Sequence, residues 1–130
     1  MSRYFKSVAL SDVGLHRNEN EDAGWAGHTV LAVADGLGGH VGGEIASALA
    51  IREISRLEKI SLNARNFETT VTNTFLEINN LMAQQMKNNR ELRGMGTTLT
   101  SVFIGKESTY LAHLGDSRAY LIRKIGRAHV

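Results

Sequence analysis

The sequence predicts an α+β domain in which helices cover an antiparallel sheet. Two short apolar runs come first, and two segments follow in which apolar residues have helical spacing. Strand-like alternation fills most of the remaining chain. Because strands and helices do not alternate in regular βαβ units, the pattern favours an antiparallel sheet. The 130 residues, 42% of them hydrophobic, suffice for one domain with a sizeable core.

Each element is predicted from its apolar period. Apolar and β-branched residues at 5–10 and 29–34 predict two short strands that end at turn residues. Apolar positions three and four residues apart predict one helix over 45–57 and a second over 66–86. Beyond Gly94 the period is close to two, which predicts three further strands. These strands are expected at 98–104, 109–114 and 117–122.

Composition excludes several classes of function. A formal net charge of +2, with no cluster of five Lys and Arg residues, gives no indication of nucleic-acid binding. The absence of cysteine excludes disulfides, thiolate catalysis and Cys-ligated zinc. No apolar run is long enough to cross a bilayer and no signal segment opens the chain. We therefore expect a soluble cytoplasmic protein with no membrane partner.

The last six residues, 125–130, read Ile-Gly-Arg-Ala-His-Val directly after a predicted strand. This hexapeptide resembles a translated sequencing adapter, and we predict that it is a non-native tail. The domain sequence would then comprise residues 1–124, and the natural gene would continue beyond Lys124.

Two polar segments carry most of the candidate chemistry. Residues 17–22 combine an arginine with three carboxylates, the oxygen ligands that hard divalent cations prefer. An acidic loop by itself is more often a solvated surface. Asp35 ends an apolar run, and Gly36 after it has no side chain, so its carbonyl could approach a cation that Asp35 binds.

The glycine-rich stretch 36–43 has two other interpretations. A phosphate-cradling loop also precedes a helix, but Glu44 stands where a P-loop requires Lys followed by Ser or Thr. The second alternative, a plain glycine-rich turn that leads into a helix, is not excluded by the sequence. Two further motifs, at 94–99 and 115–120, are ordinary turn sequences when each is taken alone.

Taken together and in this order, the motifs resemble the metal-dependent protein serine/threonine phosphatases of type 2C, above all the bacterial members. The motifs are Arg17…Glu21-Asp22, Asp35-Gly36…Gly38-Gly39-His40…Gly43-Glu44, Gly94-Met95-Gly96-Thr97-Thr98 and Gly115-Asp116-Ser117-Arg118. The resemblance runs from about residue 7 to residue 122. It implies an antiparallel β-sandwich flanked by helices in four layers, of which this chain would be the truncated N-terminal half.

The resemblance implies a pair of Mg²⁺ or Mn²⁺ ions. Asp35 would bridge both ions, Glu21 would bind one of them, and the Gly36 carbonyl would add a ligand. Asp116 matches a family position that is linked to a third, weaker metal. Glu19 shares an extended-chain face with Glu21 and stays a rival ligand.

The implied reaction is hydrolysis of phosphoserine or phosphothreonine by in-line attack of a metal-activated water. Arg17 would hold the substrate phosphate, and Asp22 would orient the metal-bound water. Leu37 stands where eukaryotic members often place a histidine, so the general acid is unassigned. His40 is expected to be structural.

The family takes two more metal-binding aspartates from its C-terminal half, and no aspartate follows Asp116 in this sequence. We therefore expect the chain to be inactive by itself. The complete protein would act as a monomer on a phosphorylated protein substrate, the target of a serine/threonine kinase. The alternatives are a non-catalytic regulatory or binding domain of the same fold and, third, a glycine-loop nucleotide binder.

Overall fold

The structure is a computed structural model that describes residues 3–39 and 41–124. His40 and the predicted adapter-derived tail at 125–130 lie outside these residues. In chain order the elements are β1 (Asp22–Ala26), β2 (Val30–Leu37), α1 (Gly42–Ser55), the 3-10 helix η1 (Arg56–Lys59), α2 (Phe67–Asn88), the 3-10 helix η2 (Arg90–Leu92), β3 (Gly96–Thr97), β4 (Leu99–Ile104) and β5 (Thr109–Leu114).

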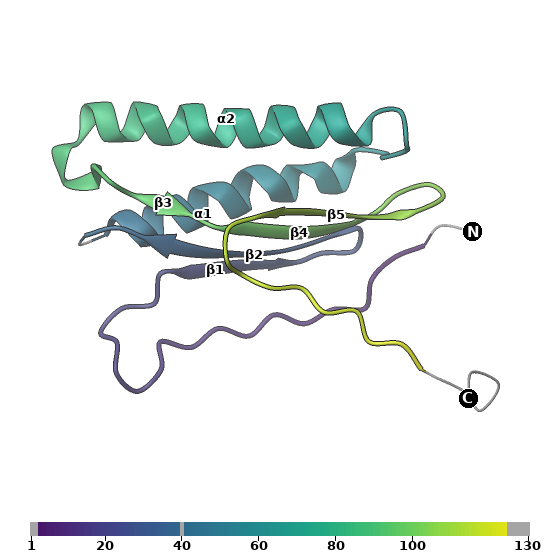
Figure 1. Cartoon of the computed structure of the whole chain (residues 1–130), viewed down its shortest axis with the longest axis horizontal. Coiled ribbons are helices and arrows are strands. Elements are labelled where there is room, and N and C mark those ends of the chain that lie inside the picture. Colours follow the sequence, from purple (N-terminus) through teal and green to yellow (C-terminus); the bar gives the residue numbers. More distant parts are fainter. Residues whose placement is uncertain (1–2, 40, 125–130) are drawn as a thin grey trace.

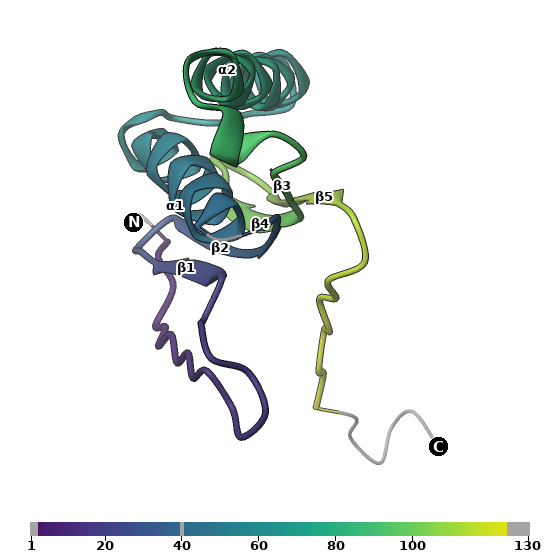
Figure 2. The same ribbon diagram turned by 90° about the vertical axis from the view of Figure 1, so that its left-hand side faces the viewer.

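The strands form one antiparallel sheet in the order β1-β2-β4-β5, with the short β3 also paired to β2. Both helices lie on the same face of this sheet (Figure 1). Seen end-on, α2 lies above α1 and α1 lies above the sheet, while both terminal segments run on the opposite side (Figure 2). We call that opposite side the open face. No strand of the described part of the chain is packed on it.

The central strand β2 sets which side chains meet the helices. Val30, Ala32 and Ala34 are buried, whereas the residues between them face the open side and are less buried. The register places Val30 opposite Phe103 of β4, so the inner sides of both strands face the helices. Because alternate residues of a strand point to opposite faces, Asp35 lies on the open face.

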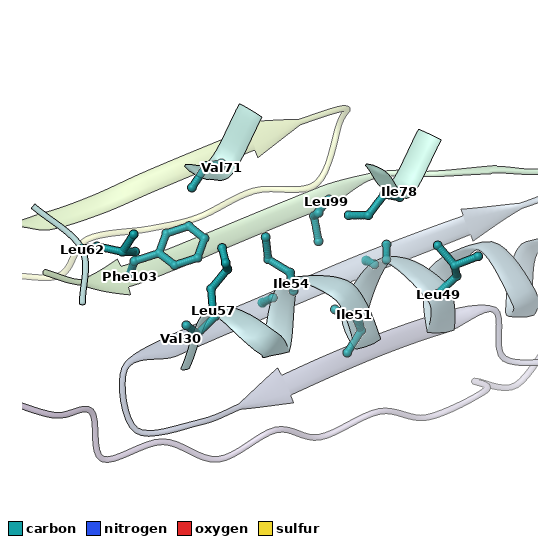
Figure 3. Packing of buried hydrophobic residues seen from close by; sticks show 13 residues of the cluster. Val30, Leu49, Ile51, Ile54, Leu57, Leu62, Val71, Ile78, Leu99 and Phe103 are labelled. Atoms are coloured by element: carbon teal, nitrogen blue, oxygen red, sulfur yellow. The ribbon is translucent and has the colours of Figure 1, made fainter. Parts of the chain in front are cut away.

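The core lies between the helices and the sheet (Figure 3). Ile54 of α1 and Phe103 of β4 are fully buried. The ring of Phe103 packs edge-on against Phe67 of α2, with ring centroids 5.6 Å apart, and Phe67 stacks on Tyr110 of β5 at 4.3 Å. Burial of a side chain of this size contributes roughly 1.5–3 kcal/mol, so these contacts fix α2 on the β4–β5 side.

The structure confirms both predicted helices and three of the predicted strands, in β2, β4 and β5. β2 is longer than predicted, since it continues through Asp35 to Leu37 and Asp35 lies inside the strand. β1 was not predicted, because 22–26 has no apolar run and forms a strand only by pairing with β2. None of the described helices is long and apolar enough to cross a membrane.

The predictions of strands at 5–10 and 117–122 are wrong. Both segments are extended chain outside any strand. Residues 5–10 have the apolar pattern of a strand, but Phe5 N bonds His28 O at 2.6 Å and the Ser7 hydroxyl bonds Gly27 O at 3.1 Å, and both acceptors lie in the turn between β1 and β2. An apolar pattern makes a strand only where a neighbouring backbone completes the ladder.

Candidate metal site

Five of the six predicted site residues line one pocket at the end of the β1–β2 pair, away from the turn that joins the strands. The pocket has a volume of about 220 Å³. These five residues are Arg17, Glu21, Asp22, Asp35 and Gly36. With Asp12 and Glu19, which also line it, the pocket collects five carboxylates and one guanidinium. Such an excess of negative charge favours a bound cation.

Asp22 and Asp35 form a like-charged pair across the two strands. They are directly opposite in the β1–β2 register, and both are exposed. Partial burial, followed by the repulsion from Asp35, raises the pKa of Asp22 above its ordinary value, while Arg17 acts in the opposite direction. Like charges placed directly opposite in a sheet are destabilising, and a divalent cation would offset that cost.

Glu21 is fixed by its backbone. Its carbonyl accepts hydrogen bonds from Gly36 N at 3.1 Å and from the buried hydroxyl of Ser47 in α1 at 2.6 Å. Its carboxylate lies against Gly43, in the first turn of α1, where the helix dipole favours an anion. Glu21 and Asp35 therefore approach the pocket from the two opposite faces of the β1–β2 pair.

Gly36 and Gly43 allow β2 and α1 to meet at their backbones. A Cβ atom on Gly36 would overlap the Gly43 carbonyl, and a Cβ atom on Gly43 would overlap the Glu21 carboxylate. Packing against α1 is thus one sufficient reason for glycine at position 36. The approach of its carbonyl to a cation stays a prediction.

Hard oxygen donors are the ligands that Mg²⁺ and Mn²⁺ prefer, and the carboxylate residues Glu21 and Asp35 line the pocket together with Gly36. Across residues 3–39 and 41–124, no three Asp, Glu or His side chains are gathered closely enough to hold a metal ion. The chain as described therefore fits the chemistry of the predicted ions but supplies fewer than three grouped side-chain ligands.

Asp116 is the predicted site residue that does not line this pocket. It lies in the turn after β5, where Gly115 has φ of +106°. Its neighbour Ser117 lies beside a larger cavity of about 870 Å³ on the open face, which Asp22 and Asp35 also line. The structure thus brings the turn of Asp116 toward the same face as Asp35.

Two residues that support the site were given no role in it from the sequence, although Thr98 belongs to one of the quoted motifs. Ser47 bonds the backbone of Glu21, and Thr98 accepts a hydrogen bond from the backbone of Asp35 at 2.9 Å. Both are buried hydroxyl residues, at 1% and 9% exposure. Ser47 could have been found as a polar residue on the apolar side of the predicted helix, whereas the alternation of the following strand places Thr98 on the side away from Leu99 and Phe103 and gives no such signal.

Comparison with known proteins agrees with the motifs. Residues 3–130 match the family model described as Protein phosphatase 2C. The serine/threonine protein phosphatase PstP of Mycobacterium tuberculosis is 40% identical over 116 residues, which cover 89% of this chain and 22% of that protein. The serine/threonine phosphatase stp of Listeria monocytogenes is 35% identical over 121 residues, which cover 87% of this chain and 48% of that protein.

Solved structures show the same similarity. The catalytic domain of PstP in complex with two manganese ions superposes with a TM-score of 0.80 at 39% identity, over 89% of this chain and 49% of that one. Stp1 of Staphylococcus aureus gives a TM-score of 0.75 at 36% identity, over 88% of this chain and 48% of that one. The chain thus spans half or less of the length of these relatives. It belongs to the protein phosphatase 2C family.

Proposed function

We propose that the whole protein is a metal-dependent serine/threonine phosphatase, and that this chain supplies the part of the catalytic domain that contains Asp35. The relatives from M. tuberculosis and L. monocytogenes are named as serine/threonine phosphatases. The observation that carries the proposal is the pocket that places Asp35, Asp22, Glu21 and Arg17 together. Its carboxylates suit a divalent cation and its guanidinium suits a phosphate.

In this proposal Glu21, Asp35 and the Gly36 carbonyl hold Mg²⁺ or Mn²⁺, and Asp116 binds a further ion. One relative was solved with two manganese ions. When bound, such ions lower the pKa of an attacking water and neutralise charge on the phosphoryl oxygens. Partial burial and then the repulsion from Asp35 raise the pKa of Asp22, and a divalent cation beside these two carboxylates would offset that repulsion.

In addition to the metal ligands, one residue of this chain would bind the substrate phosphate and another would orient the attacking water. The Arg17 guanidinium donates two parallel hydrogen bonds to the substrate phosphate, for which its planar geometry is suited. Asp22 accepts a hydrogen bond from the attacking water and so directs its lone pair toward phosphorus. The substrate would be a phosphoserine or phosphothreonine of a protein that a serine/threonine kinase modifies.

Hydrolysis of a phosphothreonine peptide by the whole protein, with and without Mn²⁺, tests this function. Asp35→Asn keeps the size of the side chain but removes its charge, and we expect it to abolish Mn²⁺-dependent turnover. Asp12→Asn is the matched control, because Asp12 lines the same pocket but its side chain accepts a bond from Gly14 N of its own loop at 2.7 Å. Unaltered turnover in Asp35→Asn would refute the proposal.

A non-catalytic domain of the same fold is the second candidate. This candidate is favoured because no three metal-binding side chains are grouped together in the described residues. Reading the gene downstream of the codon for Lys124 separates the two candidates. Aspartates in Asp-Gly and Asp-Asn contexts would support the phosphatase, and their absence would support a regulatory or binding domain.

A further inference from the structure

The hydrogen-bond ladder on one side of β2 is interrupted opposite Asp35. The antiparallel register is the same before and after the interruption, with Val33 opposite Thr100 and Gly36 opposite Thr97. This register places Asp35 opposite Thr98, yet Thr98 belongs to neither β3 nor β4. The break in the sheet therefore coincides with the residue that we propose to bind metal.

The side chain of Thr98 takes the place of the missing ladder bond. Thr98 N donates to Asp35 O at 2.9 Å, as in a regular antiparallel pair. Asp35 N, however, donates to the hydroxyl oxygen Oγ1 of Thr98 at 2.9 Å. The Thr98 carbonyl instead accepts from the Thr97 hydroxyl at 2.8 Å. Thr98 thus holds the backbone N–H and C=O of Asp35, one of them through its side chain.

The Thr98 hydroxyl is itself fixed by the turn after β5. Since Oγ1 accepts the Asp35 N–H, its own proton can be donated to Ser117 Oγ, which lies 2.8 Å away. Gly115 packs against the other side of Thr98, because a Cβ atom there would lie 2.6 Å from Thr98 Cγ2. Thr98 is 9% exposed, so solvent competes little for these bonds.

We propose that Thr98 is a positioning residue that sets the direction of the Asp35 carboxylate through its hydroxyl. This inference rests on the proposed metal-binding role of Asp35. Without the hydroxyl, the Asp35 N–H loses its acceptor, and the backbone at 35 is free to turn toward the regular ladder geometry. Residues that orient a metal ligand in this way typically change metal affinity by roughly 10- to 100-fold when they are replaced.

Thr98→Val and Thr98→Ser in the whole protein separate the hydroxyl from the shape of the side chain. Valine keeps the branched shape and removes the hydroxyl, and we expect calorimetric titration to show Mn²⁺ binding weakened roughly 10- to 100-fold. Serine keeps the hydroxyl, and we expect it to retain affinity close to that of the unaltered protein. Thr100→Val is the control, because the Thr100 hydroxyl pairs with His113 Nδ1 instead.

Two results would overturn this role: Mn²⁺ affinity unchanged in Thr98→Val, or equally weakened in the valine and serine variants. Asp35→Asn, titrated in parallel, tests the metal site itself, so failure of the proposed function is distinguishable from failure of the positioning role. If Thr98→Val does not fold, Ser117→Ala replaces it as the test. That variant removes only the outer partner of the hydroxyl and is expected to weaken Mn²⁺ binding by a smaller factor, and unaltered binding would contradict the proposal.

Discussion

Glu58→Ala is expected to destabilise the β1–β2 pair by about 3 kcal/mol. Glu58, in η1, accepts hydrogen bonds from Trp25 Nε1 at 3.1 Å, Thr29 N at 3.1 Å, Thr29 Oγ1 at 2.9 Å and Val30 N at 2.9 Å. Hydrogen bonds to a charged group contribute roughly 1.5–3 kcal/mol each. Glu58 is half-buried, so water can replace some of these hydrogen bonds in the variant. The value of about 3 kcal/mol therefore includes only the bonds from the two backbone donors, each at the lower end of that range.

This contribution is expected to depend on pH. Burial alone would raise the pKa of Glu58, but the hydrogen bonds from Trp25, Thr29 and Val30 outweigh it and hold the pKa below its ordinary value of 4.5. A carboxylate whose pKa is lower in the folded state stabilises that state fully above its unfolded pKa. The stabilisation is therefore complete above about pH 4.5 and is lost as the pH falls through the lower folded value.

Urea unfolding of the whole protein, followed by circular dichroism at pH 7 and at acidic pH, measures both effects. The difference in unfolding free energy between the unaltered protein and Glu58→Ala should be large at pH 7 and should shrink as the pH falls below 4.5. Glu77→Ala, at an exposed position of α2, is the control and should stay within about 0.5 kcal/mol of the unaltered protein. Equal stability of the two variants, or a difference that does not change with pH, would refute the reasoning.

Two further predictions concern the contact between Gly43 and the Glu21 carboxylate, and the open face of the sheet. Gly43→Ala should displace the Glu21 carboxylate, and we expect it to lower the unfolding free energy by about 1–3 kcal/mol and to weaken Mn²⁺ binding. Gly39→Ala is the control, because a Cβ atom there meets no atom within 4 Å, and it should leave both stability and Mn²⁺ binding unchanged. Leu111→Thr on the open face should lower the fluorescence of a dye that binds exposed apolar surface when the 130-residue chain is tested. Leu76→Thr, similarly exposed on α2, is its control, and an equal loss of signal in both would contradict the prediction.

The elements with a strong apolar period could be predicted from the sequence. α1, α2, β4 and β5 carry that period because one side of each is buried in the shared core. β1 could not be predicted, since its strand conformation comes from pairing with β2 and leaves no apolar pattern in Asp22–Ala26. The segments 5–10 and 117–122 show the reverse case, in which the pattern is present and the ladder partner is not.

The charged residues of the site could also be predicted, but the framework that holds them could not. Arg17, Asp22 and Asp35 stand in motifs that are recognisable in the sequence, and they line one pocket in the structure. The hydroxyl of Thr98 bonds a backbone 63 positions away, and that of Ser47 bonds one 26 positions away. Such bonds depend on register and helix packing, which no local pattern encodes.

The thermal melting of the whole protein with and without Mn²⁺, compared with that of Asp35→Asn, tests the central claim most directly. An ion that binds only the folded state raises the melting temperature, so the unaltered protein should be stabilised by Mn²⁺. In Asp35→Asn we predict that this rise is lost, and that the metal-free variant melts higher than the unaltered protein because the like-charged pair with Asp22 is removed. An undiminished Mn²⁺-dependent rise in Asp35→Asn would contradict the proposed metal site.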